Sequence, residues 1–181
     1  MERYNDYDDF AYTYNRHWGL SWRNFGPVMD HILFNALPSG SRVLDLCCGT
    51  GNQLKKLSDA GFKNLTGVDL STEMLKVAWK GNKIENLLKC DVQHTGLPGA
   101  SFDIIIISFA VHEKPARMQH NMLAEAKRLL APEGQLVLVD FSLDDQADMI
   151  SKIAAGMIER MAGKEHYRNF KAYVNKGGMC P

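Results

Sequence analysis

A short apolar run that ends on small and polar residues is the part of the sequence best suited to binding a ligand. In VLDLCCGTGN, residues 43–52, the run breaks at Gly49 and Gly51, and a helical spacing of apolar residues begins at Asn52. Glycines let a backbone approach a ligand closely, and the N-terminus of the following helix presents N–H groups to it. A strand that turns on glycines into a helix is the first half of a nucleotide-binding unit.

Two acidic residues stand where they could recognise a nucleoside. Asp69 ends a second apolar run, twenty residues after Gly49, and Asp91 follows a third run with Val92 next to it. An acid at the position of Asp69 can accept hydrogen bonds from both ribose hydroxyls, and it would repel a 2′-phosphate. The alternative is that Asp69 only caps the helix that follows it.

His112 is the best candidate for a general base. It follows the apolar run of residues 102–108 and precedes Glu113. The ordinary imidazole pKa of about 6.5 suits removal of a proton from a phenol, an amine or an enolate. The alternative is a loop histidine that shapes a pocket or binds backbone groups. We expect no metal, because HEKPA has Ala116 where the zinc motif HExxH requires its second histidine.

Strand-like and helix-like segments alternate along the sequence, which indicates a parallel sheet with helices on both faces. Ligands of such sheets bind beyond the carboxyl ends of the strands, so the candidate residues should meet in one crevice. Strands are expected at residues 42–47, 64–69, 84–90, 102–108 and 135–141, and helices at residues 51–60, 71–80 and 115–130.

Four segments, in this order, resemble the class I S-adenosylmethionine (SAM)-dependent methyltransferases. They are VLDLCCGTG, GVDLSTEMLKVA, KCDVQHTGLPGASFDIIIIS and RLLAPEGQLVLVDF. The type 11 branch, which includes ubiquinone- and menaquinone-methyltransferase-like proteins, is the most similar, and YDDFAYTYNRHW resembles its N-terminal helix. The resemblance implies an α/β, Rossmann-like parallel sheet of order 3-2-1-4-5 and SAM as the cofactor.

The resemblance also implies roles around the methionine and ribose parts of SAM. Asp45 matches the acid that orients the methionine amino group, and Gly49 and Gly51 match the glycines beneath the methionine and ribose. Asp69 matches the acid that binds the ribose hydroxyls. Cys47 departs from the pattern, because it stands where the first glycine of the family is commonest, and it would narrow the floor of the cofactor site.

The remaining matched residues concern the adenine and the reactive methyl group. Leu70 and Met74 match apolar side chains near the adenine. Asp91 matches the residue that recognises the adenine amino group, with Val92 beside the ring. Ser108 lies where the end of the fourth strand reaches the methyl group.

The expected function is therefore methyl transfer from SAM to a small-molecule acceptor, which the sequence does not identify. One alternative is a catalytically silent module that holds SAM or its demethylated product, S-adenosylhomocysteine (SAH). Another is an NAD-dependent dehydrogenase. NAD is disfavoured because the third glycine of G-x-G-x-x-G is replaced by Leu54.

The charge balance and the cysteines indicate which kinds of partner and which cellular compartment to expect. Basic and acidic residues both number 21, so the formal net charge is zero and gives no general attraction to nucleic acid or an anionic membrane. No apolar run approaches the roughly 20 residues that cross a bilayer. The four cysteines form no CxxC pair, which is typical of a cytoplasmic protein with reduced thiols.

We expect one domain, as a monomer or homodimer, with an N-terminal helical lid at 1–41, a cofactor-binding core at 42–141 and C-terminal helices at 142–181. A stripe of Met149, Ile153, Met157 and Met161 suggests that the last part either packs on the sheet or covers a pocket. The resemblance implies a C-terminal strand hairpin, for which we expect no counterpart within residues 142–181. The outer edge of the fifth strand is therefore expected to be covered by the C-terminal helices or by a second subunit.

Overall fold

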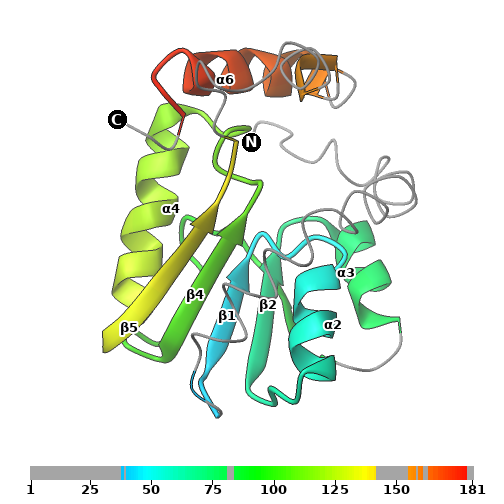
Figure 1. Cartoon of the computed structure of the whole chain (residues 1–181), viewed down its shortest axis with the longest axis vertical. Coiled ribbons are helices and arrows are strands. Elements are labelled where there is room, and N and C mark those ends of the chain that lie inside the picture. Colours follow the sequence, from blue (N-terminus) through cyan, green and yellow to red (C-terminus); the bar gives the residue numbers. More distant parts are fainter. Residues whose placement is uncertain are drawn as a thin grey trace.

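The computed structural model describes residues 38, 40–80, 84–141, 155–157, 159–160 and 163–178. In this part of the chain five parallel strands form one sheet of order β3-β2-β1-β4-β5, with helices on both faces (Figure 1). The predicted Rossmann-like fold and its strand order are confirmed. The strands are β1 (Val43–Leu46), β2 (Leu65–Asp69), β3 (Asn86–Lys89), β4 (Phe102–Ser108) and β5 (Leu130–Val139), and the helices are α2 (Asn52–Asp59), α3 (Thr72–Trp79), α4 (Ala116–Leu129) and α6 (Lys164–Val174).

Two of the expected segments lie largely outside the described residues. These are the N-terminal lid and most of the methionine stripe near the C-terminus, of which only Met157 is described. Its side chain is 62% exposed, so at this position the stripe does not pack on the sheet.

The central strand β4 is buried on both faces. Its residues Ile104–Ile107 are at most 2% exposed. Ile105 packs in a cluster with Met122 of α4, whereas Ile106 packs in a second cluster with Leu54 of α2. Successive residues of a strand point to opposite faces, so helices on both sides require an uninterrupted apolar run. The hydrophobic core therefore consists of two layers that hold the strand ends in place.

Local capping explains where α3 begins. The hydroxyl of Ser71 accepts a hydrogen bond from the backbone N–H of Met74 at 3.1 Å. This is the predicted N-cap. Asp69, the last residue of β2, is separated from the first residue of α3 only by Leu70 and Ser71. The short connection holds the end of β2 and the start of α3 together at the carboxyl edge of the sheet.

The predicted start and end of the fifth strand were wrong. We expected a loop at APEG and a strand at residues 135–141, but β5 begins at Leu130, directly after α4, and ends at Val139. Leu130 pairs with Phe102, and the register then shifts. Gly134 lies within this shift, where a Cβ atom would come within 3.1 Å of the Asp103 carbonyl oxygen. In place of the expected loop, the backbones of β4 and β5 thus lie in close contact at this point.

The outer edge of β5 is only partly covered. Among the described residues β5 pairs with β4 alone, and Leu136 is 39% exposed. Helix α6 lies across the carboxyl end of the sheet and not along this edge (Figure 1). The expectation that C-terminal helices shield the strand is therefore wrong for α6. Cover by a second subunit stays a prediction.

Candidate functional site

Hydrogen bonds at the carboxyl edge of the sheet join the ends of β2 and β4 to the turn and the helix α2 that follow β1. The backbone N–H of Gly49 donates to Oδ2 of Asp69 at 2.8 Å. The hydroxyl of Ser108, the last residue of β4, donates to Oε1 of Gln53 at 2.9 Å. Residues that are far apart in sequence thus meet at the carboxyl edge of the sheet, where parallel α/β sheets bind ligands in a crevice.

In the turn after β1, every second residue has a left-handed backbone conformation. Cys47, Gly49 and Gly51 have φ angles of 63°, 52° and 69°. Glycine is favoured in this region, which explains why the resembled family prefers glycine at the position of Cys47. A Cβ atom on Gly51 would lie 2.9 Å from Cβ of Ala78, whereas one on Gly49 would meet nothing within 4 Å. Glycine is therefore needed at position 51 because α3 packs closely against it, whereas Gly49 borders open space that a ligand can approach.

Asp69 joins this turn to the start of α3. Its two carboxylate oxygens accept hydrogen bonds from the backbone N–H groups of Gly49 and Ser71, both at 2.8 Å. Burial raises the pKa of Asp69, and the two backbone donors oppose that rise. Each carboxylate oxygen has a further lone pair. The residue can therefore cap the turn and also accept hydrogen bonds from ribose hydroxyls, so the two interpretations of Asp69 are compatible.

Asp45 is buried beneath the same turn, with 3% of its surface exposed. Burial, and to a smaller extent the charge of Asp69, raises the pKa of Asp45 well above its ordinary value. A buried carboxyl group is stabilised in its charged form by a cationic partner. An ammonium group such as that of methionine would supply this partner.

The thiols of the adjacent cysteines lie close to these acids. Burial raises the pKa of both Cys47 and Cys48 above the ordinary thiol value. The described cysteines, which include Cys90, are free thiols.

The residues expected near the adenine differ in accessibility. Leu70 is 40% exposed and can contact a ligand from the crevice. Met74 and Val92 are at most 6% exposed, so both side chains belong to the core. They could contact an adenine ring only through the small part of their surface that stays exposed. The carboxylate of Asp91 accepts a hydrogen bond from the backbone N–H of Gln93 at 2.9 Å. Asp91 is exposed and remains accessible to a ligand.

His112 lies between two carboxylates. Its Nδ1 atom is 2.5 Å from Oδ1 of Asp140, and its Nε2 atom is 3.3 Å from Oε1 of Glu159. Oδ2 of Asp140 also accepts hydrogen bonds from the backbone N–H groups of Val111 and His112. The imidazole packs against the ring of Phe141, with centroids 4.8 Å apart.

This geometry does not suit a general base. Burial disfavours the charged form of His112, but the hydrogen bonds to Asp140 and Glu159 outweigh it and raise the pKa of His112 to about 10. At neutral pH the ring is then an imidazolium that donates from both nitrogens. An imidazolium has no lone pair with which to accept a proton. In this arrangement His112 instead links the ends of β4 and β5 to the helical segment that contains Glu159.

The raised pKa of His112 predicts that stability falls at alkaline pH. The folded-state pKa of about 10 lies above the unfolded value of 6.5, so the stabilisation is complete below pH 6.5 and is lost as pH rises to 10. Urea unfolding of the wild-type protein at several pH values should show the free energy of unfolding declining across this window. A curve that stays flat from pH 7 to 10 would contradict a protonated His112.

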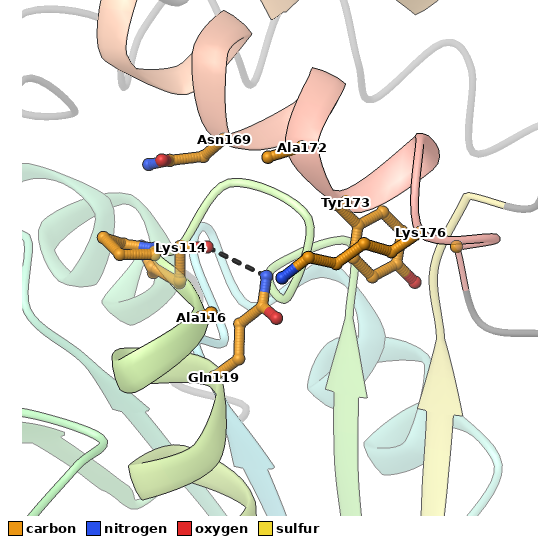
Figure 2. Close-up of a pocket in the computed structure, with 9 residues that line it drawn as sticks. Lys114, Ala116, Gln119, Asn169, Ala172, Tyr173 and Lys176 are labelled. Carbon is orange, nitrogen blue, oxygen red and sulfur yellow. Dashed lines mark hydrogen bonds between the residues drawn. The ribbon is translucent and has the colours of Figure 1, made fainter. Parts of the chain in front are cut away.

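A cavity of about 150 Å³ lies next to the crevice, between the N-terminal turn of α4 and helix α6 (Figure 2). Lys114, Gln119 and Lys176 contribute polar groups to its wall. The ammonium of Lys114 is 2.6 Å from a carboxylate oxygen of Glu113. Burial opposes ionisation of Glu113, but Lys114 and His166 outweigh that effect and lower its pKa. Glu113 is thus held as a carboxylate by Lys114 and His166.

Neither a metal site nor a membrane-spanning helix is found in the part of the chain that the structure describes. No three residues of the types His, Cys, Asp and Glu come together there as metal ligands would. None of the described helices combines the length and apolar character needed to traverse a bilayer.

A Rossmann-like parallel sheet whose glycine turn after β1 is hydrogen-bonded to an acid at the end of β2 is the architecture of a nucleotide-binding protein. The sequence of residues 44–138 matches the family model described as a methyltransferase domain, type 11. The chain therefore belongs to the SAM-dependent methyltransferase family.

Two similar relatives cover most of the chain. A 27-O-demethylrifamycin SV methyltransferase from Amycolatopsis mediterranei is 24% identical, over 97% of this chain and 72% of its own length. A demethylmenaquinone methyltransferase from Bacillus licheniformis is 26% identical, over 94% of this chain and 73% of its own length.

Among solved structures, a SAM-dependent methyltransferase from Aquifex aeolicus is 28% identical. It superposes with a TM-score of 0.55 over 74% of this chain and 78% of that one. A complex of DhpI with SAM and HEP has a TM-score of 0.66 over 77% of this chain and 64% of that one. At 22% identity, the second likeness concerns the fold alone.

Some residues of the site were not identified from the sequence. Asp140 and Glu159, which bind His112, belong to segments that we expected to be a strand and a packing helix. Gln53 was assigned only to a helix. The sequence offered one signal for Gln53, a polar residue two positions after Gly51 at the start of the predicted helix; the structure shows that its side chain is buried, at 6% exposure. No comparable signal marked the two carboxylates.

Proposed function

We propose that this protein transfers the methyl group of SAM to a small-molecule acceptor. The observation that carries the proposal is the hydrogen bond between Gly49 and Asp69 in a chain that belongs to the methyltransferase family. This hydrogen bond holds Asp69, which we propose binds the ribose hydroxyls, against the glycine turn. Asp45 would hold the amino group of the cofactor, and Asp91 and Leu70 would border its adenine. The reactive methyl group would then lie near Ser108, at the end of β4.

SAM supplies an activated methyl group on a sulfonium sulfur. The chain's own residues have to align the acceptor in line with that methyl group and exclude water, which can account for much of the rate acceleration. Because His112 is held as a cation, we propose that it acts by holding the ends of β4 and β5 and not by removing a proton. An acceptor that ionises near neutral pH fits this arrangement best, since it needs no strong base.

Turnover of SAM to SAH is the direct test of this function. We would screen a panel of small acceptors, beginning with demethylmenaquinone and 27-O-demethylrifamycin SV, because two relatives are named for these compounds. The expected result is SAH formation that depends on one class of acceptor. Binding of SAH without turnover by any acceptor would favour the catalytically silent module instead.

Cofactor choice is predicted separately. Calorimetric titration should show binding of SAM and SAH and no binding of NAD, because Leu54 replaces the third glycine of the dinucleotide pattern and its side chain is fully buried against the sheet. Tight binding of NAD in the absence of SAM binding would overturn the proposed function.

We also propose a cytoplasmic setting without nucleic-acid or membrane partners. The zero formal net charge and the free thiols of the described cysteines support it. The proposed oligomeric state is a monomer or a homodimer. Light scattering over a range of concentrations distinguishes the two.

A further inference from the structure

One buried polar group at the carboxyl edge of the sheet has no hydrogen-bond partner among the residues that the structure describes. Gln53 is 6% exposed, and its Oε1 atom accepts a hydrogen bond from the hydroxyl of Ser108. The Nε2 atom of the same amide is buried, and no described residue accepts a hydrogen bond from it. Leaving a buried donor unsatisfied costs about 1–3 kcal/mol, so native proteins rarely do so without a reason. A bound ligand atom that accepts from this amide would remove that cost.

The surroundings of Gln53 favour a negatively charged acceptor. Gln53 is the second residue of α2, whose N-cap Gly51 offers no side chain to the first turn, and no acidic residue lies in that turn. The N-terminus of a helix attracts anions through its exposed N–H groups and its dipole. The unsatisfied amide and the uncapped helix end are two separate indications of an anionic group at one place.

The groups around the crevice match the two charges of an amino-acid tail. Asp45, which is buried and has a raised pKa, would gain from an ammonium group. Gln53 and the N-terminus of α2 would gain from a carboxylate. The cofactor of the proposed function carries both groups on its methionine part.

We infer that Gln53, oriented by Ser108, donates a hydrogen bond to the carboxylate of the cofactor's methionine tail. The inference rests on the proposed function and assigns one further residue to the same site. Because Ser108 holds the oxygen end of the amide, the nitrogen end is fixed as the donor to the ligand.

The test compares two ligands that differ only in the tail. SAH carries the amino-acid group, whereas 5′-methylthioadenosine keeps the adenine, ribose and sulfur but lacks the carboxylate. Calorimetry with Gln53→Met, which keeps the length of the side chain and removes the donor, should show SAH binding weakened roughly 10- to 100-fold. Binding of methylthioadenosine should change less than about twofold, which also shows that the variant is folded. Gln53→Glu should weaken SAH binding at least as strongly, through repulsion of the carboxylate.

A matched control is Gln135→Met, which makes the same change at an exposed position of β5 opposite Ile104, near the other end of the sheet. It should leave both affinities unchanged. Equal weakening of both ligands by Gln53→Met, or no weakening of either, would overturn the inference while leaving the proposed function intact. A wild-type protein that binds neither SAM nor SAH would overturn the proposed function together with the inference.

Discussion

Replacing His112 with alanine is expected to lower the free energy of unfolding by about 3–5 kcal/mol. The substitution leaves the carboxylates of Asp140 and Glu159 without their shared cation, in a place where both side chains are at most 8% exposed. It also removes an imidazole that packs against Phe141 and Phe170. Urea denaturation at pH 7 measures the effect.

A histidine elsewhere in the protein provides the control. His120 is exposed on α4, so His120→Ala should change the free energy of unfolding by no more than about 0.5 kcal/mol. If His112→Ala were equally mild, the two carboxylates would have to be well solvated, and the interpretation of His112 as a structural cation would fail. A double variant that replaces both His112 and Glu159 should recover part of the loss, because it leaves one buried charge fewer without a partner.

Replacing Asp69 with alanine is expected to lower cofactor affinity by about 2–3 kcal/mol, the scale of hydrogen bonds to a charged group. The same change releases the backbone N–H groups of Gly49 and Ser71, so the glycine turn loses the bond that holds it against β2. Calorimetry should show weaker binding of both SAH and methylthioadenosine, since both contain the ribose. This pattern differs from that of Gln53→Met, which should affect SAH alone.

Asp59→Ala is the matched control for Asp69, because Asp59 is an exposed carboxylate at the other end of α2. It should leave the affinity for both ligands unchanged. If Asp69→Ala reduced the thermal stability but kept full affinity for SAH, the residue would be a turn cap only.

The fold could be predicted from the sequence because its signals are local. The apolar run that predicts β4 and the glycines that follow β1 can each be recognised within a few consecutive residues. In a parallel sheet the carboxyl ends of the strands lie at the same edge, so the residues that follow them come together there. The position of Asp69 beside the glycine turn could be predicted for the same reason, since one helical connection separates it from Gly49.

The environment of His112 could not be predicted, because it depends on contacts between distant segments. Asp140 lies 28 residues further along the chain, and Glu159 belongs to another segment. One sequence shows that a histidine follows β4 but not whether carboxylates surround it. The ordinary pKa of histidine therefore suggested a base, whereas the two partners make it a cation. The start of β5 was missed for a related reason, because proline and glycine in APEG usually indicate a loop, and the pairing of Leu130 with Phe102 across the sheet outweighs that tendency.

The half-buried Cys47 and the buried Cys48, which precede Gly49, have a consequence for a protein that handles a sulfonium. A thiolate is a strong nucleophile, and one placed beside a methyl donor would compete with the intended acceptor and become methylated itself. Burial raises the pKa of both Cys47 and Cys48, so at neutral pH they remain thiols, which are much poorer nucleophiles. The raised pKa of the two thiols would thereby protect them from alkylation by a methyl donor bound at this turn.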